Sequence, residues 1–229
     1  GSTTNTGYRK LLVAPVTMRD RFLALIEREA DHARAGRPSG IRAKMNQLED
    51  PRMISALYRA GQAGVPILLN VRGLCCLRPG VPGLSENIRV YSVVSRFLEH
   101  GRIYRFDNGG EPESFVGSAD WMVRNLDRRM ETIMPIEDVR VRRQLDQILA
   151  VYEADNETAW ASQPDGPYIR RAPANGEPDA ACTVPLSVKR PGRPGSCASP
   201  EGGRQSSAAA TAAPGHRWNN MQVMIAPPG

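Results

Sequence analysis

Hydrophobic and polar positions follow two different periods along the first half of the chain. Between Met18 and Ala35 the apolar side chains recur at helical spacing with charges opposite them, which predicts an amphipathic helix ending at Gly36. A second helix is predicted from Pro51 to Ala60, because proline is favoured in the first helical turn. Strands are predicted on either side of these helices at Lys10–Pro15, Ile41–Met45 and Ile67–Val71, of which the last is an apolar run of strand length. The order strand–helix–strand–helix–strand predicts right-handed crossovers and a parallel sheet.

The second half of the chain mixes strand patterns with loops. Residues 72–87 are rich in Gly, Pro and Arg, which predicts a loop directly after the third strand. Ligands of open α/β sheets bind outside such strand ends. An Asn-Gly-Gly turn at 108–110 separates two strand patterns, so we expect a hairpin there. The other elements expected from apolar spacing are strands at Ile88–Val94, Arg102–Phe106, Glu113–Gly117 and Glu131–Ile136, and a helix at Val139–Tyr152.

Beyond about Gln163 the periodicity disappears. Residues 166–229 are crowded with Pro, Gly, Ala and Ser, a composition typical of disordered segments. We therefore expect one folded domain over residues 1–165 and a disordered tail over residues 166–229. The chain begins with Gly1 rather than Met, so we expect it to be cut from a longer protein. None of its apolar runs approaches the roughly 20 residues that cross a bilayer.

The net charge of +6 is unevenly distributed. Residues 1–165 hold 23 basic and 21 acidic side chains, whereas residues 166–229 hold 7 and 3. The predicted folded part is therefore nearly neutral, and a hypothesis of polyanion binding must depend on particular arginines. The four cysteines form no CxxC pair and have no neighbouring histidine, which favours reduced thiols over a metal site.

Three clusters carry side chains suited to phosphate chemistry. The first has Arg72 at a predicted strand end, and a forked guanidinium matches the non-bridging oxygens of a phosphate. The second has His100, whose imidazole can attack phosphorus or protonate a leaving oxygen. The third has Gly117 and Ser118, small residues that let backbone N–H groups and a hydroxyl approach an anion. Each cluster alone is a weak signal, since a lone histidine beside a strand is more often structural and scattered arginines are usually solvated.

These clusters lie within longer motifs that together resemble the polyphosphate kinase family. The stretches that carry the resemblance are Leu11-Leu12-Val13-Ala14-Pro15, Ala43-Lys44-Met45-Asn46, Arg72-Gly73-Leu74-Cys75-Cys76-Leu77-Arg78-Pro79-Gly80, Gly83-Leu84-Ser85-Glu86-Asn87-Ile88, Arg96-Phe97-Leu98-Glu99-His100, Asn108-Gly109-Gly110 and Gly117-Ser118-Ala119-Asp120-Trp121-Met122. The resemblance runs from about Gly7 to about Arg171, with the motifs in the family's order and spacing. It covers the last of two phospholipase D-type domains that these kinases hold in tandem.

The resemblance implies an α/β fold of the phospholipase D type, with a mixed, largely parallel sheet flanked by helices. It implies that residues 1–165 are a catalytic domain of a long bacterial enzyme that reversibly transfers the terminal phosphate of ATP to inorganic polyphosphate, with Mg²⁺. In the family the histidine that becomes phosphorylated belongs to the preceding domain, which this chain lacks. The implied partners are ATP or ADP, inorganic polyphosphate and the missing upstream domains, in a homo-oligomer of the full-length enzyme. The implied location is the cytoplasm, with association to a membrane as part of a larger assembly left open.

The resemblance also implies roles for individual residues. Arg72 matches a position associated with the nucleotide's phosphates, and His100 matches the partner histidine that assists the transfer near the phosphate. The HxK and Gly-Ser signatures of phospholipase D appear as His-Gly-Arg at 100–102 and Gly-Ser at 117–118, so Arg102 and Ser118 would hold phosphate oxygens. No protein-bound metal site is implied, and Mg²⁺ would enter with ATP.

Two questions stay open at this point. Arg124, Asn125 and Arg129 would line a polyphosphate path, or would instead form salt bridges to Asp120, Asp127 or Glu131. For the function, the leading hypothesis is half of a phosphotransferase site that needs its other domain for turnover. The alternatives are a stand-alone phosphodiesterase or nuclease of the phospholipase D type, and a non-enzymatic fragment that binds polyanions through its basic tail. Arg102, in place of the lysine of a phosphodiesterase, argues against the first alternative.

Overall fold

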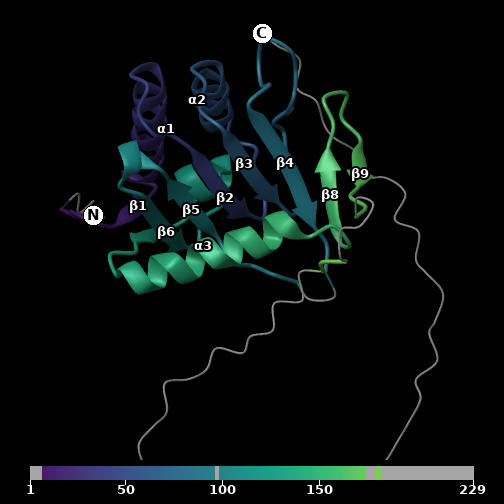
Figure 1. Cartoon of the computed structure of the whole chain (residues 1–229). Helices are drawn as coiled ribbons and strands as arrows, with labels where there is room; N and C mark the ends of the chain where they lie inside the picture. Colours follow the sequence, from purple (N-terminus) through teal and green to yellow (C-terminus); the bar gives the residue numbers. More distant parts are fainter. Residues whose placement is uncertain (1–6, 96–97, 174–178, 182–229) are drawn as a thin grey trace, which may run out of the picture. The chain divides into compact units, whose positions relative to one another are not determined.

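The computed structural model describes residues 7–95, 98–173 and 179–181, and Figure 1 shows how its elements are arranged. The helices are α1 (Met18–Arg34), α2 (Pro51–Gln62) and α3 (Val139–Ala154). The strands are β1 (Leu12–Ala14), β2 (Ile41–Met45), β3 (Ile67–Val71), β4 (Ile88–Val93), β5 (Ile103–Phe106), β6 (Glu113–Gly117), β7 (Glu131–Pro135), β8 (Ala159–Ser162) and β9 (Tyr168–Arg170). A 3₁₀ turn at Asn108–Gly110 and a π-helical turn at Arg124–Arg128 complete the set. The predicted helices and strands agree with the observed bounds to within two residues, whereas β8 and β9 were not predicted.

The strands form one sheet in the order β1-β7-β6-β5-β2-β3-β4-β8-β9. The prediction of a mixed sheet with helices packed on it is confirmed, but the prediction that it is largely parallel is wrong. Over the described residues, β2–β3 and β3–β4 are parallel and the other six strand pairings are antiparallel. The physical reason at two of these pairings is connection length, because only six residues join β5 to β6 and only five join β8 to β9, and such short loops join antiparallel strands.

The first strand also lies elsewhere than its place in the chain indicates. We expected Leu12–Ala14 to join the parallel strands, but β1 is an edge strand that pairs antiparallel with β7, with Leu12 opposite Ile133. Leu12 and Ala14 are fully buried, and α1 packs against this strand. The apolar pattern identified a strand correctly. It carried no information about the partner, since partner choice depends on contacts far apart in sequence.

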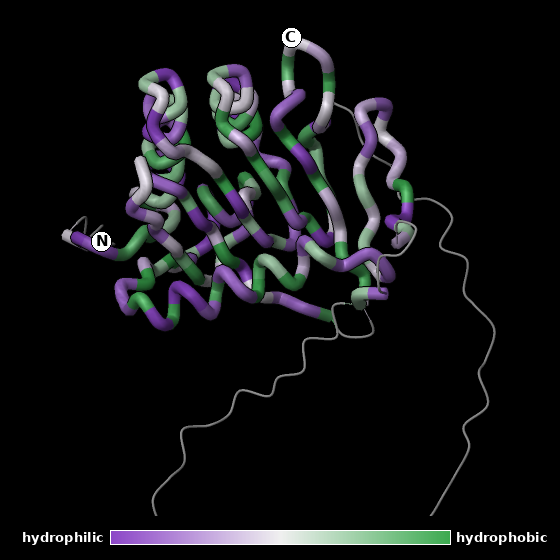
Figure 2. The backbone as a smooth tube through the Cα atoms, in the orientation of Figure 1, coloured by the Kyte–Doolittle hydropathy of each residue, from purple (hydrophilic) through white to green (hydrophobic). Residues whose placement is uncertain are grey.

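Helices cover both faces of the sheet. α1 and α2 pack against each other and bury one face, where the main core collects Phe22, Ile26, Met45, Leu57 and Leu69. α3 lies on the opposite face, as Figure 1 shows, and contributes Tyr152 to a smaller cluster with Leu68 and Tyr91. Figure 2 colours the backbone by hydropathy and shows that the central strand β3 is mostly hydrophobic, whereas hydrophobic and hydrophilic residues alternate along the surface helix α3. Within the described part of the chain, no helix is both long and apolar enough to cross a membrane.

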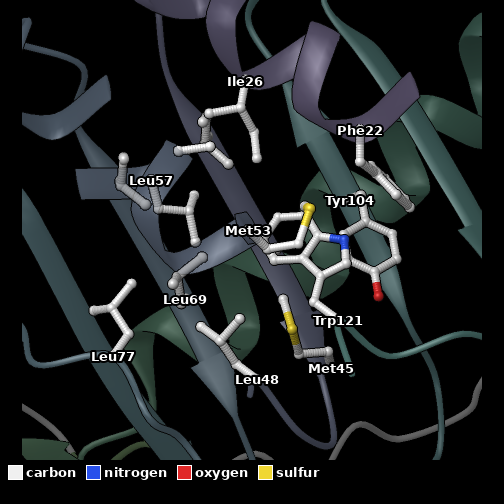
Figure 3. Close-up of a cluster of buried hydrophobic side chains, with 14 of the residues drawn as sticks. Phe22, Ile26, Met45, Leu48, Met53, Leu57, Leu69, Leu77, Tyr104 and Trp121 are labelled. Atoms are coloured by element: carbon white, nitrogen blue, oxygen red, sulfur yellow. The ribbon is translucent and has the colours of Figure 1, made fainter. Parts of the chain in front are cut away.

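Three aromatic side chains form the centre of the main core, and Figure 3 shows them side by side. Phe22 of α1 lies 4.8 Å from Tyr104 of β5 and 5.5 Å from Trp121, measured between ring centroids. Tyr104 and Trp121 stack at 5.0 Å. The buried Tyr104 hydroxyl donates a 2.6 Å hydrogen bond to the Ala119 carbonyl, and burial raises the pKa of this hydroxyl. The aromatic cluster therefore fixes the backbone that follows β6.

The β8–β9 hairpin extends the sheet beyond β4. Tyr91 of β4 lies opposite Ala161, and β9 pairs with β8 around a turn at residues 163–167. Because these strands have only four and three residues, their sequence shows no clear periodicity. The expected domain boundary after residue 165 falls inside this hairpin. Of the tail expected over 166–229, residues 174–178 and 182–229 lie outside the described residues.

Candidate functional site

The predicted site residues approach one another because four strands end or begin at the same edge of the sheet. Met45, the last residue of β2, lies beside Val71, the last residue of β3. β5 runs antiparallel to β2, so its first residue, Ile103, is also at this edge, opposite Lys44. β6 ends beside Ile103 for the same reason. Asn46, Arg72 and Ser118 directly follow β2, β3 and β6, and Arg102 directly precedes β5. We call the surroundings of these four residues the strand-end site.

Arg72 is the first residue after β3. Its backbone is fixed at both ends, since its N–H donates to the Met45 carbonyl at 3.2 Å and its carbonyl accepts from the Ser92 hydroxyl at 2.9 Å. The side chain is half-buried, and its Nη1 atom is fully buried without a hydrogen-bond partner among the described residues. A guanidinium that is partly desolvated and unpaired is costly unless an anion approaches it. Arg72 therefore offers a charged donor at the strand-end site.

His100 lies in the short segment before β5, and its side chain is exposed. Its carbonyl oxygen accepts a 2.7 Å hydrogen bond from Nη1 of Arg102, which holds the backbone of the histidine close to the start of the strand. The imidazole is consequently carried by an anchored backbone but stays accessible to a ligand. This combination suits a side chain that gives or takes a proton at a bound phosphate.

Arg102 points toward the protein rather than toward the solvent. Its Nε and Nη2 donate to the two oxygens of Asp120 at 3.1 and 3.0 Å, and this carboxylate is buried. Asp120 also accepts a 2.7 Å bond from the backbone N–H of Asn46. The bidentate pair joins the start of β5 to the segment after β6 and to the end of β2. All three guanidinium nitrogens of Arg102 therefore donate to acceptors within the protein, namely Asp120 and the His100 carbonyl.

Gly117 and Ser118 end β6 at the edge of the site. A side chain at Gly117 would overlap the Thr132 carbonyl and the backbone of Ile133, so this glycine permits the close approach of β7. Ser118 is exposed, and its hydroxyl oxygen accepts a 3.3 Å bond from the Thr132 N–H. The hydroxyl proton remains able to donate to a ligand oxygen. The structure therefore gives Gly117 a packing role and leaves Ser118 accessible.

The three residues proposed for a polyphosphate path differ in their contacts. Asn125 is buried and donates to Glu131 at 2.7 Å, and Arg129 lies 3.8 Å from the same carboxylate. Arg129 thus forms the salt bridge to Glu131 that the alternative expected. Asn125 forms a hydrogen bond to the same carboxylate. Arg124 is exposed on the π-helical turn, and no ion pair forms between it and another described residue. Of the three, Arg124 has a side chain available to a ligand.

Sequence reasoning overlooked the part played by Lys44, Asn46 and Asp120. All three are buried polar residues that contact the segment around His100, directly or through Arg102. The sequence holds little signal of this, because Lys44 alternates with Ala43 and Met45 and so stands at a position that a half-buried strand normally turns toward solvent. Nowhere in the described ranges do three or more His, Cys, Asp or Glu side chains gather in a way that would hold a metal ion.

Comparison with known proteins gives a consistent result. The family described as polyphosphate kinase C-terminal domain 2 matches residues 11–181. The chain is 59% identical over 177 residues to a polyphosphate kinase of Thermosynechococcus vestitus and 56% identical over 177 residues to one of Synechocystis. Each of these matches covers 77% of this chain and 24% of the relative.

A solved structure supports the same comparison. The crystal structure of a polyphosphate kinase from Porphyromonas gingivalis superimposes with a TM-score of 0.72 and 42% sequence identity. The superposition covers 75% of this chain and 26% of that chain. The chain thus spans about a quarter of the length of the relatives that it matches.

Proposed function

Because this chain belongs to the family of polyphosphate kinase C-terminal domain 2, we propose that its strand-end site supplies one half of a site for phosphoryl transfer between ATP and inorganic polyphosphate. The other half, including the histidine that accepts the phosphate, lies in the preceding domain of the longer enzymes. Phosphoryl transfer depends mainly on positioning and on stabilising charge that spreads over the phosphate oxygens. We propose that residues of this chain both position the phosphates and stabilise their charge.

The observation that carries the proposal is the buried Nη1 atom of Arg72. Among the described residues this atom has no hydrogen-bond acceptor, whereas the guanidinium of Arg102 in the same site is bonded to a carboxylate. A phosphate of ATP would supply the missing acceptors, and a charge-assisted hydrogen bond of this kind contributes about 1.5–3 kcal/mol. We therefore assign Arg72 to binding of the nucleotide's phosphates.

His100 and Ser118 complete the proposed contacts. His100 would donate a proton to, or stabilise charge on, the oxygen between the transferred phosphate and its leaving group. The accessible hydroxyl of Ser118 would donate to a non-bridging oxygen. Arg124 would attract the polyphosphate chain at the edge of the site, with Asn125 and Arg129 in supporting roles through Glu131. A direct phosphate contact from Arg102 would require its pair with Asp120 to open.

Mg²⁺ fits this proposal as a companion of the nucleotide. Near the strand-end site the buried carboxylate of Asp120 is already bonded to Arg102 and Asn46, so it is a poor candidate for a metal ligand. Mg²⁺ commonly keeps several waters and binds through substrate phosphates. Its contribution when bound would be to neutralise charge on the phosphates of ATP. The residues of this chain would orient those phosphates.

The direct test measures binding and turnover separately. Isothermal titration calorimetry with tripolyphosphate and with ATP–Mg²⁺ should show binding that Arg72→Met weakens by roughly tenfold or more, given the size of one charge-assisted hydrogen bond. Arg78→Met is the matched control, because this neighbouring guanidinium is bonded to the Pro164 carbonyl instead. Equal affinity of the Arg72→Met variant and the unmodified chain would overturn the assignment.

Turnover distinguishes the alternatives. Incubation with ATP, Mg²⁺ and polyphosphate should give no net synthesis, because in this proposal the phosphate-accepting histidine belongs to the preceding domain. Hydrolysis of a simple phosphodiester that is lost in His100→Ala would instead favour a phosphodiesterase. Binding that disappears when residues after Arg171 are deleted, and that falls steeply with salt, would favour a polyanion-binding tail.

The partners and location follow from the same proposal. We propose ATP or ADP, inorganic polyphosphate and the upstream kinase domains as partners, within a homo-oligomer of the longer enzyme. The proposed location is the cytoplasm. Size-exclusion chromatography of a complete relative, compared with this chain, would test whether oligomer formation needs the other domains.

A further inference from the structure

Three successive backbone carbonyls around His100 are each bonded by a different side chain. Lys44 Nζ donates to the Gly101 carbonyl at 3.1 Å, and Arg102 Nη1 donates to the His100 carbonyl at 2.7 Å. The Asn46 amide, turned so that its nitrogen faces an acceptor, donates to the Glu99 carbonyl at 3.1 Å. In the same orientation its oxygen accepts from Arg102 Nη2 at 2.8 Å. A segment of three residues without regular secondary structure is thereby held at every peptide.

The three donors are themselves held in place. Arg102 and the backbone of Asn46 are both bonded to Asp120, as described above. Lys44 has a side chain that is only 5% exposed, and its Nζ lies 3.8 Å from the carboxylate of Glu99 and 5.1 Å from the centroid of the Tyr152 ring on α3. Donors with fixed positions hold their acceptors more tightly than exposed, rotating side chains do.

Fold stability alone does not explain why a lysine occupies this position. A buried ammonium is costly to desolvate, and an apolar side chain at the end of β2 would avoid that cost. Arg42 lies on the same face of the same strand and is also charged, but it is bonded to Asp146 of α3. Lys44 thus contacts the segment of His100 at Gly101 and Glu99, whereas Arg42 contacts Asp146 on the helix.

We infer that Lys44, Asn46 and Arg102 are positioning residues that aim the imidazole of His100, an inference that rests on the proposed function of that histidine. Because the His100 side chain is exposed, packing does little to restrict it, and its direction depends on the backbone that carries it. Fixing this backbone before the phosphate arrives removes part of the entropy cost of reaching a productive geometry. Arg102, in place of the lysine of a phosphodiesterase, then acts through the His100 carbonyl and not on the phosphate itself.

The test uses the complete chain and four variants, of which His100→Gln serves only to identify the histidine signal. Lys44→Met removes the donor and the charge with little change in volume, and Arg42→Met is the matched control, because it removes a cation from the same face of β2 without touching the 99–101 segment. Lys44→Gln keeps an amide donor and serves if the methionine variant does not fold. The His100 imidazole signal in ¹H–¹³C NMR spectra, identified by its loss in His100→Gln, is followed in the free protein and during titration with tripolyphosphate.

We expect the His100 signal of the unmodified chain to be sharp and to shift on adding tripolyphosphate. Lys44→Met should broaden or split this signal and weaken the affinity measured from it on the order of tenfold, with a smaller loss in Lys44→Gln. Arg42→Met should leave the His100 signal and the tripolyphosphate affinity unchanged, even if its thermal midpoint falls as far as that of Lys44→Met. The inference is overturned if His100 behaves alike in the unmodified chain, in Lys44→Met and in Lys44→Gln.

The positioning of His100 and the proposed function of this histidine can fail separately. If tripolyphosphate does not shift the His100 signal of the unmodified chain, while Lys44→Met still broadens it in the free protein, the positioning stands and the proposed function fails. If tripolyphosphate shifts the signal equally in all variants, the proposed function stands and the positioning fails.

Discussion

The chain contains two centres built around arginine, and they differ in what the guanidinium contacts. At the first, which we call the Arg19 junction, Arg19 of α1 donates to Asp50 at the start of α2, at 3.0 and 2.8 Å, and to Asp127 in the π-helical turn. At the strand-end site, Arg102 is likewise bonded to a buried carboxylate, but Arg72 has no acceptor for its buried Nη1 among the described residues. Similar side chains therefore serve two different purposes within one small domain.

The difference shows how to separate structural from ligand-binding arginines. At the Arg19 junction the two carboxylates raise the pKa of the arginine, and the arginine lowers the pKa of Asp127. All three guanidinium nitrogens of Arg19 donate to these two carboxylates, so this arginine is already engaged within the protein. By contrast, the buried Nη1 of Arg72 meets no acceptor within the described part of the chain, and Arg72 lies at the strand ends where ligands of such sheets bind. Substitutions that remove one arginine at a time should expose this contrast as differences in stability.

The largest loss is expected from Arg102→Met. This change leaves the buried carboxylate of Asp120 without its cation and removes the donor to the His100 carbonyl, so the free energy of unfolding should fall by about 3–5 kcal/mol. Urea denaturation followed by tryptophan fluorescence measures it, since Trp121 follows Asp120 directly. Arg102→Lys keeps the positive charge but not the bidentate guanidinium, so its free energy of unfolding should fall by less than that of Arg102→Met. A loss below about 1 kcal/mol in Arg102→Met would contradict a structural role.

A smaller loss is expected from Arg19→Met. Asp50 is buried and loses its cation, but it keeps its hydrogen bond from the Met53 N–H at the start of α2, at 2.9 Å, and Asp127 can be rehydrated. We therefore expect the free energy of unfolding to fall by about 2–3 kcal/mol in the same urea experiment. Arg21→Met, two residues along the helix, is the control. Equal effects at positions 19 and 21 would mean that the junction contributes little.

Much of the fold could be predicted from sequence, and the contacts of the site could not. Helices and strands such as α1 and β3 follow from apolar spacing, which is a local property. Whether Arg72 or Arg102 meets a carboxylate depends on Asp120, which is 18 residues from Arg102 and reaches it through a hairpin. The positions of Arg72 and His100 at one edge were anticipated from strand order and from family resemblance. The part played by Lys44 was not, because a lysine in a strand pattern is ordinarily assigned to the surface.

A pH-dependent effect should appear at the exposed side of the Arg19 junction. The pKa of Asp127 is lowered by its hydrogen bond to Arg19, so its contribution to stability is present above the pKa of the unfolded chain and is lost as the pH falls through the lower folded value. Asp127→Asn should thus be less stable than the unmodified chain near neutral pH, by less than about 1 kcal/mol because the pair is partly exposed. The difference should shrink below about pH 4. A difference that grows on acidification would have the wrong sign for this pair.

The smallest effect on stability is expected where the effect on binding is large. Arg72→Met removes a half-buried guanidinium that has no acceptor for its buried nitrogen, so no native hydrogen bond or ion pair of that side chain is broken among the described residues. The free energy of unfolding should stay within about 0.5 kcal/mol of the unmodified value, or rise, because an unpaired buried donor is replaced by an apolar side chain of similar length. A fall of more than about 2 kcal/mol in urea denaturation would show that Arg72 has a structural partner, and the contrast with Arg19 and Arg102 would disappear. Unchanged stability together with weakened tripolyphosphate binding is the combination that only a ligand-binding arginine produces.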